Sequence, residues 1–361
     1  MEIVNTPKAD EQSVQHLPDK ATIGATVPTT EELFEAAEGV SISPTRAAIR
    51  RFMRDRRAVI CSGILAFIII FSFIFPLIYQ HLGPTYLGGV TGKETIMPQD
   101  YHNPTWGELE QSDVAGTFLP LGPDSLKYPL GTDTTGHDIF AGLMAGVNVS
   151  IEVAILVEIV DIGLGVLLGT LAAWYGGWLG AVLDRFTDIM FAFPGLLLIL
   201  LIAATLGPQF DMVFHTSLLG RILLLTFAIG LLAWPLMMRY VRGQSLLLKE
   251  QQYVEAARTV GTPNIRIIWR HLVPNLLNVV VVAATLDILT TIIGEAGISF
   301  LGAGIRPPNT SLGLMISNAA NKLETNWTEM LWPCVVLVVL VLSFSFIGDG
   351  VRDAFDPRTK D

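Results

Sequence analysis

Residues 253–261 of this chain read Tyr-Val-Glu-Ala-Ala-Arg-Thr-Val-Gly, and Pro274-Asn275 follow thirteen residues later. The stretch lies in a loop rich in Lys and Arg, between two long apolar segments. Its first residues favour a short helix, because Glu, Ala and Arg have high helix propensity. Gly261 permits the left-handed conformation that commonly ends a helix, and Pro263 prevents the helix from continuing. Pro274 suits the start of the next helix, where a missing N–H donor is tolerated. The sequence therefore predicts a short helix between two membrane helices.

The composition is that of a membrane protein. Apolar residues make up 51% of the 361 residues and charged residues only 16%, whereas soluble domains have about 25% charged residues. The mean hydropathy is +0.52. Six apolar segments reach or approach the roughly 20 residues that a helix needs to cross the hydrocarbon core. They lie near residues 58–79, 146–173, 186–206, 218–240, 272–294 and 329–348. The fold class predicted is an all-α polytopic membrane protein with six transmembrane helices.

Basic residues set the expected orientation, because cytoplasmic loops carry an excess of Lys and Arg. The long connection 80–145 has only two lysines against eight acids. Three basic clusters lie elsewhere: one before the first segment, one between the fourth and fifth, and one after the sixth. Their members are Arg46, Arg50, Arg51, Arg54, Arg56 and Arg57; Arg239, Arg242, Lys249, Arg258, Arg266 and Arg270; and Arg352, Arg358 and Lys360. Six alternating spans put all three clusters on one side, so both termini are expected in the cytoplasm.

These observations divide the chain into five parts. Residues 1–45 are expected to be a disordered acidic cytoplasmic tail: eight acids against two lysines give a charge of −6, out of −10 for the whole chain, and there is little apolar content to bury. Residues 46–79 hold an N-terminal cytoplasmic segment and the first span, and 80–145 form an extracytoplasmic loop. Residues 146–350 form a core with five spans and a cytoplasmic loop at about 241–271, and 351–361 are a cytoplasmic tail.

The stretch quoted above resembles the EAA loop of ABC importer permeases, which docks the membrane subunit onto a separate ATPase. The usual pattern is Glu-Ala-Ala, three residues, Gly, nine residues and Ile-x-Leu-Pro. Glu255, Ala256, Ala257, Gly261 and Pro274 match it, while His271 and Val273 replace the Ile and Leu. The resemblance implies that these residues, with Arg258, couple the chain to an ATPase. The two alanines would keep one helix face narrow, and Glu255 would offer a carboxylate to the partner.

Further motifs resemble the C-type subunit of dipeptide and oligopeptide permeases, a family that also includes nickel permeases. Residues 129–138 read Pro-Leu-Gly-Thr-Asp-Thr-Thr-Gly-His-Asp, with His137 where the family has Arg. Residues 294–302 read Gly-Glu-Ala-Gly-Ile-Ser-Phe-Leu-Gly and are followed by Pro307-Pro308, Leu312-Gly313 and Ser317. Residues 348–358 read Gly-Asp-Gly-Val-Arg-Asp-Ala-Phe-Asp-Pro-Arg, and Ala-Phe-Pro-Gly occupies 192–195. The resemblance covers residues 46 to 358 and implies the type I ABC importer permease fold.

The resemblance also implies a set of partners. This chain would pair with a homologous second permease in a heterodimer, carry two ABC ATPase subunits and receive substrate from an extracytoplasmic peptide-binding protein. The expected location is the bacterial inner or plasma membrane, with the lipid bilayer as solvent and no nucleic-acid partner. ATP and Mg²⁺ would be bound by the ATPase subunits, and no cofactor by this chain.

Four acids lie inside apolar segments, where charge is expensive and usually functional. Glu158 and Asp161 are three residues apart and share one helix face; Asp287 lies deep in the fifth span and Glu295 at its outer end. These acids either line the translocation pathway and attract the amino end of a peptide, or pair with polar groups of neighbouring helices or of the partner permease. The second interpretation is favoured.

The sequence offers no enzymatic motif. The nearest approach to a phosphate-binding loop, residues 88–94, has the wrong spacing and a Glu where the Ser or Thr should be. The six histidines are scattered without metal-ligand spacing, so no metal site is expected. The predicted function is an importer permease for di- or oligopeptides. A permease for nickel or another small solute is the alternative within the family, and a gradient-driven secondary transporter is the alternative outside it.

Overall fold

The computed structural model describes residues 44–87, 130, 133, 139–214, 217–307, 309–324 and 327–355. The chain divides into two units, Met1–Arg46 and Ala47–Asp361, and the fold below is that of the second. The acidic tail at 1–45, most of the 80–145 loop and the end of the 351–361 tail lie outside the described residues, so the predictions made for them stay predictions.

The described residues form helices and contain no strand. In chain order these are α2 (Pro44–Phe52), α3 (Arg56–Leu87), α4 (Ile139–Tyr175), α5 (Gly177–Ala192), α6 (Gly195–Phe214), α7 (Leu218–Lys249), α8 (Gln252–Thr259), α9 (Asn264–Ile267), the π-helical turn η4 (Ile268–Leu272), α10 (Val273–Phe300), α11 (Leu312–Ala320) and α12 (Trp327–Phe355). The expectation of an all-α protein is confirmed.

Among the described residues, five helical segments are long and apolar enough to cross a membrane. They are Arg56–Phe75, Gly195–Phe214, Leu218–Lys249, Asn264–Phe300 and Trp327–Phe355. The segment predicted at 146–173 lies within α4, a 37-residue helix that is not among these five. That α4 also crosses the bilayer, which would make six spans, stays a prediction. Exposed large apolar side chains line α3, α6 and α12, as expected where a helix faces lipid or another membrane subunit.

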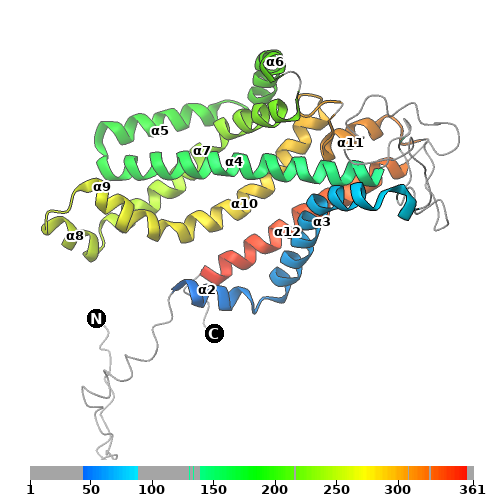
Figure 1. Ribbon diagram of the computed structural model, residues 1–361. Helices are drawn as coiled ribbons and strands as arrows, with labels where there is room; N and C mark the ends of the chain where they lie inside the picture. The colour runs from blue at the N-terminus through cyan, green and yellow to red at the C-terminus, as the bar shows by residue number, and fades with distance from the viewer. Residues whose placement is uncertain are drawn as a thin grey trace, which may run out of the picture. The chain divides into compact units, whose positions relative to one another are not determined.

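Helix α4 holds the unit together (Figure 1). It packs most extensively against α7 and also contacts α3, α10 and α11. One end of α4 meets α11, where Gly146 closely approaches the backbone of Leu312. The other end lies by α8, where the Arg258 guanidinium carbon is 4.4 Å from the centre of the Trp174 ring. The chain therefore has the EAA stretch and α11 at opposite ends of one long helix.

The structure differs from the sequence prediction at the third span. The sequence predicts one helix over 186–206, but α5 ends at Ala192 and α6 begins at Gly195. Phe193 is extended, with φ −87° and ψ 140°, because a residue before a proline is pushed out of the helical region. The apolar helix after this break runs to Phe214. As a result, α5 is a separate amphipathic element that lies alongside α7.

Candidate functional site

Helix α8 contains the Glu-Ala-Ala stretch and ends as its sequence predicts. Gly261 has φ 80°, the left-handed conformation. Its N–H donates to the carbonyl of Arg258 at 2.8 Å, and the N–H of Thr262 donates to the carbonyl of Ala257 at 3.1 Å. This pair of hydrogen bonds is the Schellman motif, which satisfies the last carbonyls of a helix. The turn is fixed by backbone geometry, so the direction in which the chain leaves α8 is fixed as well.

Helix α8 is anchored through a single buried side chain, Val254. Val254 belongs to an apolar cluster built from α4, α7, α9, η4 and α10, with Trp174, Val241, Ile267 and Leu272 among its members. The other α8 side chains are exposed or half-buried, and Val260, directly after the helix, is 85% exposed. Helix α8 is therefore held against neighbouring helices by Val254, while its other side chains are exposed or half-buried.

Trp174, the penultimate residue of α4, is the residue of α4 against which α8 packs. Arg258 stacks over the Trp174 ring. The ammonium of Lys249, at the end of α7, lies 5.8 Å from the same ring and donates hydrogen bonds to the carbonyls of Ala173, at 3.2 Å, and Trp174, at 2.8 Å. A cation at this position satisfies helix-terminal carbonyls and is attracted by the negative end of the helix dipole. Sequence analysis counted Lys249 only as a member of a basic cluster and did not identify Trp174, because their contacts join segments far apart in the chain.

The chain after the EAA stretch contains a π-helical turn that the sequence did not predict. The helix after the stretch begins at Asn264, ten residues before Pro274, and contains the π turn Ile268–Leu272. The N–H of Val273 donates to the carbonyl of Ile268, five residues back. Pro274 has no N–H and its ring crowds the carbonyl four residues earlier. The wider π turn before it relieves that crowding. Pro274 is therefore the second residue of α10, as the sequence predicts for the start of a helix, and the π turn joins α10 without a break to the helix that begins at Asn264.

A polar contact ties α8 to this π turn. Asn275 donates to the carbonyl of His271 at 2.6 Å and to the hydroxyl of Tyr253 at 3.4 Å. The Tyr253 and His271 rings are 6.2 Å apart. Partial burial raises the pKa of the Tyr253 hydroxyl above its ordinary value, so this hydroxyl stays neutral. His271, which replaces the apolar residue of the usual EAA pattern, thus lies against the first turn of α8.

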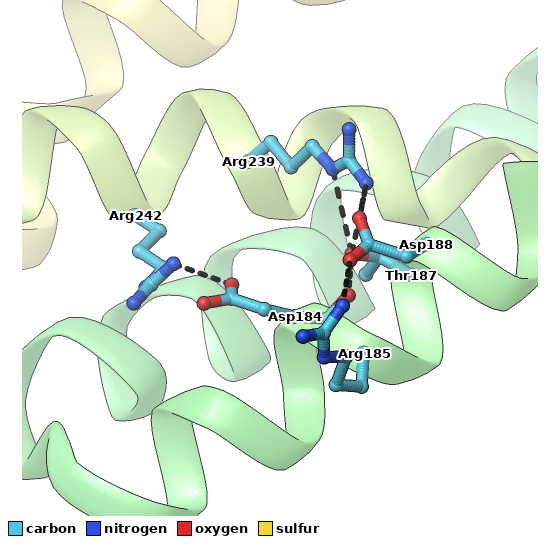
Figure 2. A network of polar contacts seen from close by, with 6 residues as sticks. All are labelled: Asp184, Arg185, Thr187, Asp188, Arg239 and Arg242. Atoms are coloured by element: carbon cyan, nitrogen blue, oxygen red, sulfur yellow. Dashed lines mark hydrogen bonds and ion pairs between the residues drawn. The ribbon is translucent and has the colours of Figure 1, made fainter.

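Ion pairs join α5 to α7 close to the EAA stretch (Figure 2). Arg239 contacts Asp188, with Nη2 2.6 Å from Oδ1, and Arg242 pairs with Asp184. Arg239 also donates to the Thr187 hydroxyl at 3.4 Å. Two arginines of the basic cluster between the fourth and fifth apolar segments are therefore partly neutralised within the chain. The acids at 184 and 188 are four residues apart and the arginines three apart, so each set lies on one helix face. That spacing could have indicated ion pairs between these two helix faces, but sequence analysis did not use it.

Three of the four intramembrane acids come together. One carboxylate oxygen from each of Glu158, Asp161 and Asp287 lies within 4.8 Å of the other two. Glu158 and Asp161, on α4, are buried, with no hydrogen-bond donor to their oxygens in the described part of the chain. Asp287, on α10, is half-buried and accepts a hydrogen bond from the Thr290 hydroxyl at 2.9 Å. We call these three residues the carboxylate trio.

Glu295 lies apart from the trio and has a different environment. It is completely buried. Its carboxylate accepts hydrogen bonds from the hydroxyls of Ser150 on α4 and Ser299 on α10, each at 2.7 Å. The Ser299 hydroxyl in turn accepts from the N–H of Ile305 at 3.2 Å. Glu295 therefore joins α4, α10 and the loop before α11. Of the two sequence interpretations, inter-helix pairing is the one that these contacts support for this residue.

A cavity of about 350 Å³ lies beside the trio, between α7, α10 and the end of α12. Its walls are mainly apolar. The lining residues are Leu236, Met237, Tyr240, Val279, Val282, Ala283, Leu286, Asp287, Thr290 and Arg352. Asp287 is the trio member that faces this cavity, while Glu158 and Asp161 lie behind it.

Comparison with known proteins relates the whole chain to transport permeases. Residues 165–361 match the family model of the binding-protein-dependent transport system inner membrane component. Residues 43–88 match the N-terminal transmembrane domain of oligopeptide transport permease C. The first match includes α5 to α12 and the EAA stretch, and the second includes α2 and α3.

Individual relatives agree with these family matches. The oligopeptide transport system permease protein OppC of Salmonella typhimurium is 35% identical over 333 residues, 92% of this chain and 97% of the relative. The glutathione transport system permease protein GsiD of Shigella flexneri is 36% identical over 242 residues, 67% of this chain and 76% of the relative. A solved structure of the MetNI methionine ABC transporter, in an inward-facing conformation, aligns with 60% of this chain and 97% of its own at 25% identity, with a TM-score of 0.48. The chain therefore belongs to the binding-protein-dependent ABC importer permeases, as a multi-pass membrane subunit of the oligopeptide C type.

Proposed function

We propose that this chain is one permease subunit of an ATP-driven importer of di- or oligopeptides. It would form half of the translocation path with a homologous second permease and receive substrate from an extracytoplasmic peptide-binding protein. The observation that carries the proposal is its 35% identity, over 92% of its length, to an oligopeptide permease. Glutathione, the substrate in the name of a second relative, is itself a peptide, which favours peptides over nickel.

In this proposal α8 is the coupling helix, which engages one of two separate ATPase subunits. Support comes from its position: Val254 and Trp174 hold it against α4, α7 and α10, while Glu255, Ala256 and Val260 are exposed. Movement of α8 would be transmitted to α4 through the contact of Arg258 with Trp174, and from Trp174 to α7 through Lys249. ATP and Mg²⁺ would be bound by the ATPase subunits, and the EAA end of the chain would face the cytoplasm together with both termini.

Charge reversal on α8 tests the coupling proposal. Glu255 is exposed, and no described residue forms an ion pair with its carboxylate. We expect Glu255→Lys to weaken ATPase association about tenfold, because it removes a charged contact worth about 1.4 kcal/mol. The matched control is Glu250→Lys, the same change at an exposed residue of the same loop outside the EAA pattern. The measurement is the amount of ATPase subunit that co-purifies with each variant, together with substrate-stimulated ATP hydrolysis. Equal assembly and turnover in both variants would show that α8 is not the docking element.

A second measurement tests the substrate. The complete transporter, reconstituted in vesicles with its binding protein and internal ATP, should take up radiolabelled peptide and leave ⁶³Ni²⁺ outside. Nickel uptake without peptide uptake would support the alternative within the family. Uptake driven by an ion gradient, with this chain alone in the vesicle, would support a secondary transporter.

A further inference from the structure

The carboxylate trio brings three acidic groups together between α4 and α10, and no ion pair to any of them is found in the described part of the chain. Glu158 is 6% exposed and Asp161 0%. No hydroxyl or N–H group among the described residues donates to their four carboxylate oxygens, and the polar neighbour of Asp161 is the carboxyl group of Asp287. Removing a charge from water without a partner is strongly unfavourable, more so in a membrane. Something that the protein chain does not supply must therefore compensate the trio.

The arginines of the neighbouring helices do not supply this compensation. Arg221 pairs with Asp211, and Arg239 and Arg242 pair with the acids of α5. Arg352 lines the same cavity as Asp287, but Glu158 and Asp161 are not part of its wall. The two α4 carboxylates are enclosed by this chain, so the amino end of a peptide or a side chain from a second subunit cannot reach them in this conformation. A small ion can.

The geometry of the trio suits one small ion. Two oxygen ligands on opposite sides of a calcium-sized cation, each about 2.4 Å from it, are about 4.8 Å apart. This is the upper limit of the separations among the three carboxylate oxygens. Carboxylate oxygens are the preferred ligands of hard divalent cations such as Ca²⁺, Mg²⁺ and Mn²⁺. The half-buried Asp287 faces the cavity and thereby offers the entry path that a metal site needs.

We propose that Glu158, Asp161 and Asp287 bind one hard divalent cation, which joins α4 to α10 beside the cavity. The spacing of the histidines in the sequence does not indicate this site, because its ligands are carboxylates from two helices distant in the sequence. The ion would offset most of the buried negative charge and fix the position of α10, the helix that continues from the EAA stretch, relative to α4. The proposal does not depend on which solute the transporter carries.

Manganese binding tests the proposal directly. The complete complex, with its partner permease and ATPases, is purified without nucleotide, treated with chelator and titrated with MnCl₂, and bound Mn²⁺ is measured by electron paramagnetic resonance. Wild type should bind one more Mn²⁺ per complex than Asp161→Asn, and Ca²⁺ should compete for it. Glu158→Gln and Asp287→Asn should each weaken binding at least tenfold, because loss of an outer-shell partner alone costs roughly 10–100-fold in metal affinity.

Glu152→Gln is the matched control, since Glu152 is a half-buried acid on α4 outside the trio, and it should bind Mn²⁺ like wild type. Co-purification of the ATPases shows that each variant is assembled, and Glu158→Gln serves if Asp161→Asn fails to assemble. The same Mn²⁺ stoichiometry in wild type and in every assembled trio variant would overturn the proposal. So would the absence of any Mn²⁺ or Ca²⁺ bound to wild type, which would mean that protons neutralise the trio.

Discussion

Gly261 is the residue of the EAA stretch whose backbone adopts the left-handed conformation. Its φ of 80° lies in a region that costs a residue with a Cβ atom roughly 1–2 kcal/mol. A Cβ at Gly261 would meet no atom within 4 Å in the described chain. The conformational cost therefore acts within this chain, and any steric cost would arise only against the docked partner.

The first prediction concerns this residue. Gly261→Val should reduce substrate-stimulated ATP hydrolysis about tenfold, since the expected strain of roughly 1–2 kcal/mol corresponds to about that factor. The amount of protein in the membrane should be unchanged. The control is Gly243→Val, at an exposed α7 glycine that also has open space around it and no positive φ. If both variants retain full stimulated turnover, the left-handed turn is dispensable for coupling.

Trp174 is the second residue on which coupling should depend. Its ring is 6% exposed and lies beneath two cations, Arg258 and Lys249. Each cation–π contact is worth about 0.5–2 kcal/mol, depending on how far it is desolvated. The ring also fills the apolar cluster that holds Val254. The contact between α8 and α4 therefore depends on an aromatic face at this position.

The second prediction follows from that contact. Trp174→Leu should lower stimulated ATP hydrolysis severalfold while the ATPases still co-purify, because α8 stays exposed but loses its aromatic contact with α4. Trp174→Phe should restore most of the turnover, since it keeps an aromatic face. Trp178→Leu, at a tryptophan that is 78% exposed, is the control and should resemble wild type. Equal turnover in the Leu and Phe variants at position 174 would contradict an aromatic role.

At the scale of elements, the pairing of α4 with α7 is set by glycine. A Cβ on Gly165 would lie 2.4 Å from Cγ of Met237, and a Cβ on Gly169 would lie 2.7 Å from the carbonyl oxygen of Met238. Small residues at such positions let two helix backbones approach closely. Gly163, two residues before Gly165, has open space instead.

The third prediction uses this difference. Gly169→Ala should destabilise the complex by about 1–3 kcal/mol, because the added methyl group meets backbone atoms that cannot move independently. Gly163→Ala should be neutral or slightly stabilising, since alanine has the higher helix propensity. Thermal unfolding of the two purified complexes in the same detergent measures the difference. An unfolding temperature for Gly169→Ala equal to that of Gly163→Ala would show that α4 and α7 are not so closely packed.

Elements defined by local rules were predictable from the sequence, and contacts between distant elements were not. The end of α8 at Gly261 depends on neighbouring residues and was predicted correctly. The break at Pro194 was missed, and proline alone would not have located it, since Pro208, Pro235 and Pro333 lie inside helices. The spacing of Glu158 and Asp161 predicted a shared face. That this face meets Asp287, or that Trp174 meets Arg258, depends on how α4 packs against α10 and α8.

At the scale of the molecule, we propose that this chain forms only half of a translocation path. Its cavity lies against α7, α10 and the end of α12, whereas a path for a polar solute must be closed off from lipid on every side. The described helices α3, α6 and α12 have exposed apolar surfaces suited to lipid or to another membrane subunit. The chain also has one EAA stretch, which in the proposed transporter would engage one of the two ATPases.

The last prediction is therefore that transport requires a second, homologous permease. Vesicles containing this chain, both ATPases and the binding protein should show no ATP-driven peptide uptake above background, and adding the second permease should restore it. Size-exclusion chromatography with light scattering should give one copy of each permease per complex. The second permease would both complete the path and bind one ATPase. A complex of this chain with a second permease that lacks its EAA stretch separates these two roles. The two permeases should still assemble, but the complex should contain one ATPase less. Uptake of peptide by this chain and the ATPases alone would contradict the heterodimer, since two copies of one permease would then complete the path.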